Sequence, residues 1–134
     1  MRKLEHIGIA VRNLEESNKL FARLLKVKHY KMEEVETEGV RTSFFALQGV
    51  KFELLEATRP DSPIARFIEK KGEGIHHLAF EVANLETAIE SYKQQGFVMI
   101  NDHPKKGADN KRIAFMHPKS NHGVLVELCE EITA

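Results

Sequence analysis

The chain has 134 residues, of which 42% are hydrophobic, and its 20 basic and 20 acidic side chains give a formal net charge of +0. This balance is typical of a globular protein, and it lacks the basic excess expected of a general nucleic-acid binder. No apolar run approaches membrane-spanning length. A single cysteine, Cys129, excludes an intrachain disulfide. We therefore expect a protein of a reducing compartment, the cytoplasm.

The first predicted element is a strand over residues 4–11, because apolar side chains occupy every second position from Ile7 to Val11. Ile7, Ile9 and Val11 share one face of this strand. Because successive side chains of a strand point to opposite faces, His6 points to the other one.

A helix is predicted next, from residue 14 to about residue 25, because Asn13 is a suitable N-cap. The apolar stripe of this helix is predicted to consist of Leu14, Leu20, Phe21 and Leu24. Three short strands complete the first module, at about residues 28–33, 40–47 and 51–56.

Residues 58–73 form the predicted joint between two halves of the chain. Ser62 is a good N-cap and Pro63 suits the first position of a short helix. The second half then repeats the plan of the first, with a strand at 75–82, a helix at 84–95, and strands near 97–101, 111–117 and 123–129.

The two halves share residues at a constant spacing. His6 aligns with His77 and Asn13 with Asn84 at one offset (77 − 6 = 84 − 13 = 71). Each half also ends on a strand with a glutamate in an apolar setting, Glu53 in the first half and Glu127 in the second. The chain therefore looks like a duplicated module with one histidine and one glutamate per copy.

The duplication predicts the fold class and the domain organisation. We expect an α+β protein in which two tandem βαβββ modules form one curved mixed sheet with helices on its outer face. The modules would span about residues 1–57 and 74–134, joined by a short helical linker (58–73), within a single domain of residues 1–134.

Two imidazoles and two carboxylates form a mixed donor set that suits one divalent ion, such as Co, Ni, Mn, Zn or Fe. We therefore predict a metal site made of His6, Glu53, His77 and Glu127. His76 is expected to point away from this site, since it neighbours His77 on a strand. The sequence leaves the choice among these metals open.

Several motifs show that the chain resembles the vicinal oxygen chelate (glyoxalase/bleomycin-resistance) superfamily, and within it the methylmalonyl-CoA epimerases. The resemblance covers nearly the whole chain. The motifs closest to the epimerase branch are Asp61-Ser62-Pro63-Ile64-Ala65, Gly72-Glu73-Gly74-Ile75-His76-His77 and His117-Pro118-Lys119-Ser120.

The resemblance implies a metal held by the same four residues and a reaction at C2 of an acyl-CoA thioester. The C2 proton would be abstracted to give a metal-chelated enolate, with the glutamate that matches Glu127 as one acid/base. The family's second acid/base glutamate stands two residues before a Gly-Val pair, where this sequence has Thr37. Glu38, or alternatively Glu36, is therefore the candidate for that second role.

A second departure lies in the loop that normally reads Gly-Ala-His-Gly-Lys, which here is Gly107-Ala108-Asp109-Asn110-Lys111. Substrate contacts are predicted at Lys106, Lys111, Lys119 and Ser120. For the lysines, which suit CoA phosphates, the alternative of solvated surface charges stays open.

Two other functions remain as alternatives. One is a lactoylglutathione lyase (glyoxalase I) acting on a glutathione hemithioacetal, and the other is a non-catalytic binding or resistance protein on the same fold. For all of them we expect a small-molecule ligand, no nucleic acid or membrane partner, and a homodimer.

Overall fold

The computed structural model describes residues 3–133, and within them the chain divides into two compact units. The N-terminal unit is His6–His76, and the C-terminal unit runs from His77 onward together with the residues up to Glu5. The first half of the chain contains β1 (Lys3–Ala10), α1 (Leu14–Leu25), β2 (Lys31–Val35), the 3₁₀ turn η1 (Glu36–Glu38), β3 (Val40–Leu47), β4 (Val50–Ala57) and α2 (Pro63–Lys71). The second half contains β5 (Gly74–Glu81), α3 (Leu85–Gln94), β6 (Lys105–Lys106), β7 (Lys111–Met116), the 3₁₀ turn η2 (Pro118–Ser120) and β8 (Val126–Glu131).

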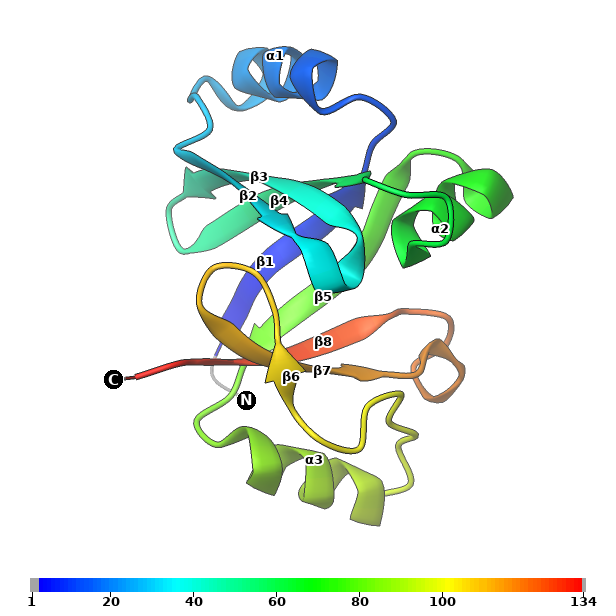
Figure 1. Cartoon of the computed structure of the whole chain (residues 1–134). Coiled ribbons are helices and arrows are strands. Elements are labelled where there is room, and N and C mark those ends of the chain that lie inside the picture. The colour runs from blue at the N-terminus through cyan, green and yellow to red at the C-terminus, as the bar shows by residue number, and fades with distance from the viewer. Residues whose placement is uncertain (1–2, 134) are drawn as a thin grey trace. The chain divides into compact units, whose positions relative to one another are not determined.

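The strands of the N-terminal unit follow the order β2-β3-β4-β1, in which β1 is parallel to β4 and the other pairs are antiparallel. Helix α1 packs on β3 and β4, and α2 packs on β4 (Figure 1). Under α1 lies a core cluster that includes Val11, Leu14, Phe45 and Leu54. The sequence alternation of β1 thus directs its apolar face to α1 and leaves the opposite face for polar residues.

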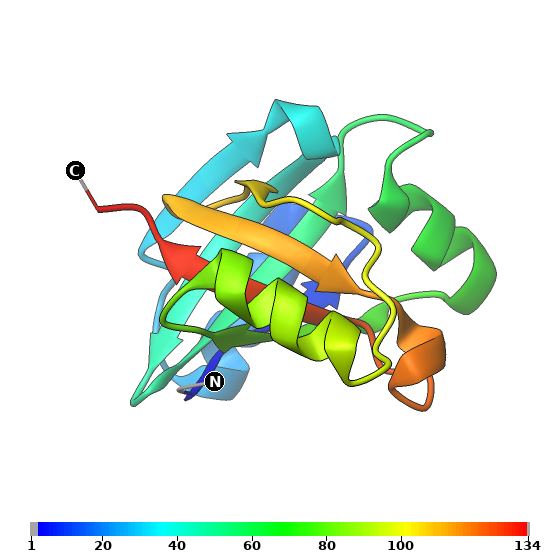
Figure 2. The same ribbon diagram turned by 90° about the horizontal axis from the view of Figure 1, so that it is seen from below.

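The C-terminal unit repeats this plan with the order β5-β8-β7-β6, in which β5 is parallel to β8 and the remaining pairs are antiparallel. Helix α3 packs on β7 and β8 (Figure 2). Its core cluster joins Leu85 and Ile89 of α3 to Ala114 and Leu128 of the strands. The element order confirms the predicted α+β class with two βαβββ modules.

The predicted helix starts are confirmed by their side-chain caps. Asn13 Oδ1 accepts a hydrogen bond from the backbone N of Glu16 at 2.9 Å, and Asn84 Oδ1 accepts one at 2.9 Å from the backbone N of Thr87. Ser62 likewise caps α2, where Pro63 occupies the first turn. No helix in residues 3–133 is long and apolar enough to span a membrane.

The predicted apolar stripe of α1 is wrong for two of its residues. The side chains of Leu20 and Leu24 are 49% and 65% exposed. Phe21 packs in the core instead, and the buried polar residue Asn18 takes a place on the packed face. Asn18 can be buried there because its Oδ1 accepts a hydrogen bond from Ser43 Oγ at 2.5 Å.

Two predicted strands are also corrected. The strand expected at 28–33 lies at Lys31–Val35, and residues 97–101 form only an isolated bridge between Met99 and Met116. There the side chain of Asn101 accepts the hydrogen bond of the Phe115 backbone N at 2.8 Å, so a regular ladder does not continue. The edge strand of the second module is β6, which lies between the strands expected at 97–101 and 111–117.

Candidate active site

The first half of the predicted metal site is a buried His–Glu pair in the N-terminal unit. His6 Nδ1 lies 3.1 Å from Glu53 Oε2, and both residues are 4% exposed. The parallel register of β1 and β4 pairs Gly8 with Glu53, so the glutamate faces the same side as His6, two residues away. The alternation that predicted the direction of His6 is thereby confirmed.

An equivalent pair lies in the C-terminal unit. His77 Nε2 is 3.3 Å from Glu127 Oε1, and both residues are 5% exposed. Here the register of β5 and β8 pairs Ala79 with Glu127, again two residues beyond the histidine. The same strand geometry thus produces the same pair twice.

An aromatic ring that the sequence reasoning missed accompanies each pair. Phe44 is the cross-strand partner of Glu53, and Phe115 is that of Glu127. The ring of Phe115 packs edge-on against the imidazole of His77, with a centroid distance of 5.7 Å and an interplanar angle of 89°. Because the two phenylalanines are also 71 positions apart, the repeat itself could have identified them.

A lysine ammonium lies over each of these rings. Lys31 Nζ is 4.7 Å from the centroid of Phe44, and Lys105 Nζ is 5.9 Å from that of Phe115. The two lysines come from β2 and β6, the edge strands of their units. Each half therefore places a lysine over the ring that lies across the strand from its glutamate.

His76 points away from this set, as predicted. Its ring packs edge-on against Phe67 of α2, with a centroid distance of 4.9 Å. Burial lowers the pKa of His76 from 6.5 to about 4, because a ring removed from water is less stable in its charged form. A neutral imidazole packed on an aromatic ring is part of the packing under α2.

Each pair has the donor chemistry and the spacing of two metal ligands. Ligands bound about 2.1 Å from one ion at neighbouring positions lie roughly 3 Å apart, and the measured separations are 3.1 and 3.3 Å. A proton shared between imidazole and carboxylate fits the same spacing, and a divalent ion would take its place. The pairs therefore fit a metal, while the convergence of all four residues on one ion stays a prediction.

The predicted second acid/base, Glu38, lies on the 3₁₀ turn η1, which ends at Gly39. Within the turn Glu36 and Thr37 are exposed, whereas Glu38 is half-buried. Successive side chains of a 3₁₀ helix fan out by about a third of a turn, so the alternation of a strand does not govern their directions. Among these three residues Glu38 is thus the carboxylate directed most toward the protein.

The predicted substrate contacts lie in different settings. Lys106 and Lys119 are exposed, whereas Lys111 on β7 is only 7% exposed. Ser120 Oγ already donates a hydrogen bond to the carbonyl of His117 and accepts one from the backbone N of Val98. The structure thus gives Ser120 a part in holding η2, and contact between these four residues and a substrate stays a prediction.

The altered loop 107–110 keeps a tight turn. Asp109 and Asn110 both adopt the left-handed conformation, with φ of 58° and 56°. Aspartate and asparagine tolerate this conformation better than most residues. The departure from the family motif therefore changes the side-chain chemistry of the loop while its backbone remains a hairpin turn.

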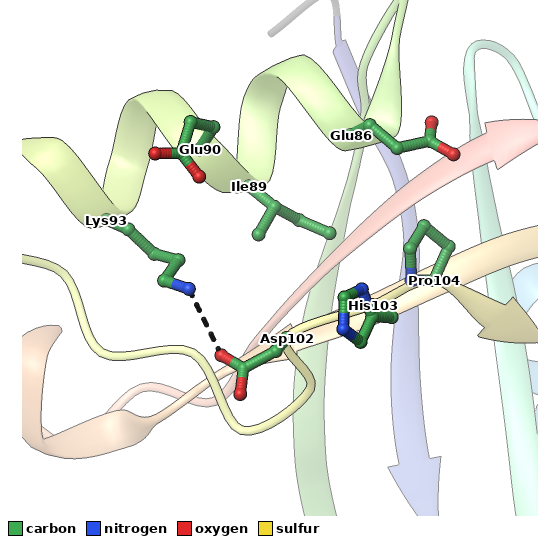
Figure 3. A pocket seen from close by; sticks show the side chains of 7 residues that line it. All are labelled: Glu86, Ile89, Glu90, Lys93, Asp102, His103 and Pro104. Atoms are coloured by element: carbon green, nitrogen blue, oxygen red, sulfur yellow. Dashed lines mark hydrogen bonds and ion pairs between the residues drawn. The ribbon is translucent and has the colours of Figure 1, made fainter.

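A separate cavity of about 390 Å³ lies between α3 and the segment before β6 in the C-terminal unit (Figure 3). His103 lines it beside Ile89, and an ion pair of 3.3 Å joins Lys93 to Asp102 at its edge. Neither His77 nor Glu127 belongs to its lining. His103 is an exposed residue.

Comparison with known proteins places this geometry in context. A model of the Glyoxalase/Bleomycin resistance protein/Dioxygenase superfamily matches residues 5–115. The chain is 40% identical to the "Uncharacterized protein YqjC" of Bacillus subtilis, over 97% of this chain and 93% of that protein. It is 37% identical to the ethylmalonyl-CoA/methylmalonyl-CoA epimerase of Cereibacter sphaeroides, over 94% of this chain and 96% of that enzyme.

The solved structures give the same picture. A Streptomyces coelicolor methylmalonyl-CoA epimerase variant in complex with 2-nitronate-propionyl-CoA is 31% identical to this chain, with a TM-score of 0.92. The match covers 100% of this chain and 97% of that one. The predicted glyoxalase-like fold is therefore confirmed.

Proposed function

Because the chain belongs to the glyoxalase/bleomycin resistance protein/dioxygenase superfamily, we propose that it is an isomerase that epimerises methylmalonyl-CoA or a related 2-substituted acyl-CoA at C2. One observation carries the proposal. Buried His–Glu pairs recur at equivalent positions of both modules, in a chain that matches an epimerase over 96% of the length of that enzyme. The acyl-CoA substrate class follows from the names of the relatives described above.

In this proposal His6, Glu53, His77 and Glu127 together hold one divalent ion. When bound, the ion supplies Lewis-acid stabilisation of the negative charge that develops on the substrate as C2 loses its proton. The four ligands are nearly inaccessible to water, which strengthens their electrostatic interactions. The identity of the metal follows from availability as well as from affinity.

Two carboxylates move the proton. C2 lies between two carbonyl groups, so its proton is acidic enough for a carboxylate base once the developing charge is stabilised. Glu127 takes the proton from one face of C2 and Glu38 returns a proton to the other, which inverts the centre. In the reverse direction the two residues exchange these roles.

The basic residues Lys106, Lys111 and Lys119 bind anionic groups of the acyl-CoA, and Ser120 contributes through η2, which its hydroxyl holds in place. Lys111 is the strongest of these candidates, because a lysine that is only 7% exposed is unusual. A homodimer and a cytoplasmic location remain predictions from the sequence.

The alternative of a lactoylglutathione lyase gains no support from the relatives described above, because the two with a named activity are acyl-CoA epimerases. No feature of the two His–Glu pairs favours a glutathione adduct. A non-catalytic resistance protein on the same fold gains no support from those relatives either.

Proton exchange tests the proposal directly. The metal-loaded protein is incubated with methylmalonyl-CoA in D2O and the C2 proton is followed by NMR, with methylglyoxal plus glutathione as a parallel assay. We expect exchange at C2 that is abolished in His77→Ala and in Glu127→Ala. Lys93→Ala, on the separate cavity, is the matched control and should retain exchange. Lactoylglutathione formation without exchange at C2 would overturn the proposal.

A further inference from the structure

The turn that carries Glu38 is held by an arginine from the joint before α2. Arg59 Nη1 donates a 2.7 Å hydrogen bond to the carbonyl of Glu36, and Nη2 donates a 3.5 Å one to the carbonyl of Thr37. The Nε of the same guanidinium lies 2.7 Å from Asp61 Oδ1. The planar group is thus oriented on one edge by Asp61 while its other nitrogens bind the backbone of η1.

The backbone at the end of the turn is fixed against the same joint. The backbone N of Thr58 donates a 2.8 Å hydrogen bond to the carbonyl of Gly39. Gly39 has φ of 66°, and a Cβ placed on it would lie 2.9 Å from Ser62 Cβ and 3.0 Å from Arg59 Cζ. Only glycine fits this close approach without displacing the joint. Residues 58–62 therefore form a support against which η1 rests.

From this contact set we infer that Arg59 is a positioning residue for the acid/base carboxylate of Glu38. The inference rests on the proposed function, and it names the residue that controls one of the two proton-transfer faces. It also explains Asp61 and Ser62 of the Asp61-Ser62-Pro63-Ile64-Ala65 motif, which contains none of the proposed metal ligands. Asp61 orients Arg59, while Ser62 begins α2 and packs on Gly39.

Magnitudes separate this role from a contribution to global stability. The Arg59 and Asp61 side chains are 42% and 69% exposed, and ion pairs at such exposure contribute little to folding. A 3₁₀ turn of three residues has few hydrogen bonds of its own, so its position depends on external contacts. Removal of Arg59 should leave the protein folded and let η1 shift, and a shift of about 1 Å can cost on the order of 10²-fold in rate.

The exchange rates at the two faces of C2 distinguish a positioning role from a merely structural one, because a general structural loss would lower both rates. Each stereoisomer of methylmalonyl-CoA loses its C2 proton to a different base, so initial exchange rates in D2O report Glu127 and Glu38 separately. The rates of the metal-loaded protein are measured by NMR for each pure isomer. In Arg59→Ala we expect the rate to fall between about tenfold and 10²-fold for one isomer and to change little for the other. Glu38→Gln should affect the same isomer.

Two further variants complete the test. Arg59→Lys keeps the charge but loses the fork that reaches Asp61 and both carbonyls, so it should restore the affected rate only in part. Arg12→Ala removes another exposed arginine–carboxylate pair of the same unit, with Glu73, and should leave both rates unchanged. If Arg59→Ala does not fold, Arg59→Lys carries the comparison between isomers.

Distinct outcomes overturn distinct claims. An equal loss for both isomers, or no loss for either, would overturn the positioning role and leave the epimerase intact. A loss confined to the isomer that Glu38→Gln leaves unaffected would overturn it as well. If the unmodified metal-loaded protein exchanges neither isomer, the proposed function fails, and the role of Arg59 fails with it.

Discussion

The two units build the same constellation from residues at matching positions. Each pairs a buried histidine with a buried glutamate, and each places a phenylalanine across the strand from that glutamate. An arginine on the neighbouring strand also joins the first turn of the helix to the last strand. Arg41 binds Glu15 and Glu56, and Arg112 binds Glu86 and Glu130. The repeated features are thus a ligand pair and an arginine clasp that holds a helix to its sheet.

The units differ at their edges. The N-terminal unit has a five-residue edge strand, the turn η1 and the helix α2, whereas the C-terminal unit has the two-residue β6 and a longer irregular segment. Glu38, proposed as the second acid/base, lies on η1, and Lys106, proposed to contact CoA, lies on β6. Lys111 lies instead on β7, the counterpart of β3. Duplication therefore accounts for the two His–Glu pairs, whereas the proposed second acid/base lies in a part that differs between the units.

The largest expected effect concerns two geometrically similar glutamates to which the proposed function gives unequal roles. In the proposed function Glu127 both binds the metal and transfers the proton, whereas Glu53 only binds the metal. Glu127→Gln should lower C2 exchange by about 10²- to 10⁴-fold, the usual contribution of a general acid/base. Glu53→Gln should cost far less, because an amide oxygen can still serve as a ligand.

Metal content measured on the same samples distinguishes binding from catalysis. Elemental analysis should find Glu53→Gln and Glu127→Gln similarly loaded when the metal is supplied in excess. Equal losses of exchange in the two variants would contradict the assigned difference and indicate that both glutamates act only as ligands.

The second comparison concerns the two phenylalanines. Phe44 is completely buried, so Phe44→Ala should lower the free energy of unfolding by about 3–5 kcal/mol. Phe115 is only half-buried but contacts the His77 ring. Phe115→Ala should therefore cost less stability and instead weaken metal affinity by about 10- to 100-fold, as is common when a ligand loses its support.

Urea unfolding and metal titration of both variants test this difference. The Phe→Leu substitutions at the two positions keep apolar volume and serve as controls. A Phe115→Ala protein with unchanged metal affinity would show that the His77 ring is held by its other contacts alone.

The sequence predicted those parts of the site that depend on local periodicity. Strand alternation placed His6 and His77 on the faces where the structure has them and turned His76 away from His77. The helix cap at Asn13 followed from side-chain chemistry alone. Each of these depends on neighbours within a few residues, which the sequence displays.

Other features depended on contacts distant in the chain. The leucines of α1 allow more than one apolar stripe. The packed face includes Asn18, and the burial of Asn18 depends on its hydrogen bond with Ser43 of β3. The support of η1 by Arg59 joins residues 23 positions apart. In the segment 97–101 a side chain of Asn101 replaced a ladder bond. The periodicity of the sequence carries no signal for such hydrogen bonds between side chains and distant parts of the chain.

The smallest expected effects concern the arginine clasps, which should respond alike in the two units. The hydrogen bond from Arg41 lowers the pKa of Glu15 below its ordinary 4.5, and the bond from Arg112 does the same for Glu86. A carboxyl with a lower pKa in the folded state is protonated at a lower pH than the same group in the unfolded chain. Its stabilising contribution is thus present above about pH 4.5 and is lost as the pH falls below that value.

The side chains of both acidic partners are about 60% exposed, so 1 M salt, which shortens the Debye length to about 3 Å, should remove most of the contribution. Urea unfolding of Glu15→Gln and Glu86→Gln should show small, similar losses at neutral pH that vanish in acid and in high salt. Glu56→Gln should cost more than either, because Glu56 Oε2 also accepts a hydrogen bond from the backbone N of Leu14 at 3.1 Å. If Glu15→Gln and Glu86→Gln differ widely, the two clasps are equivalent in geometry but not in energy.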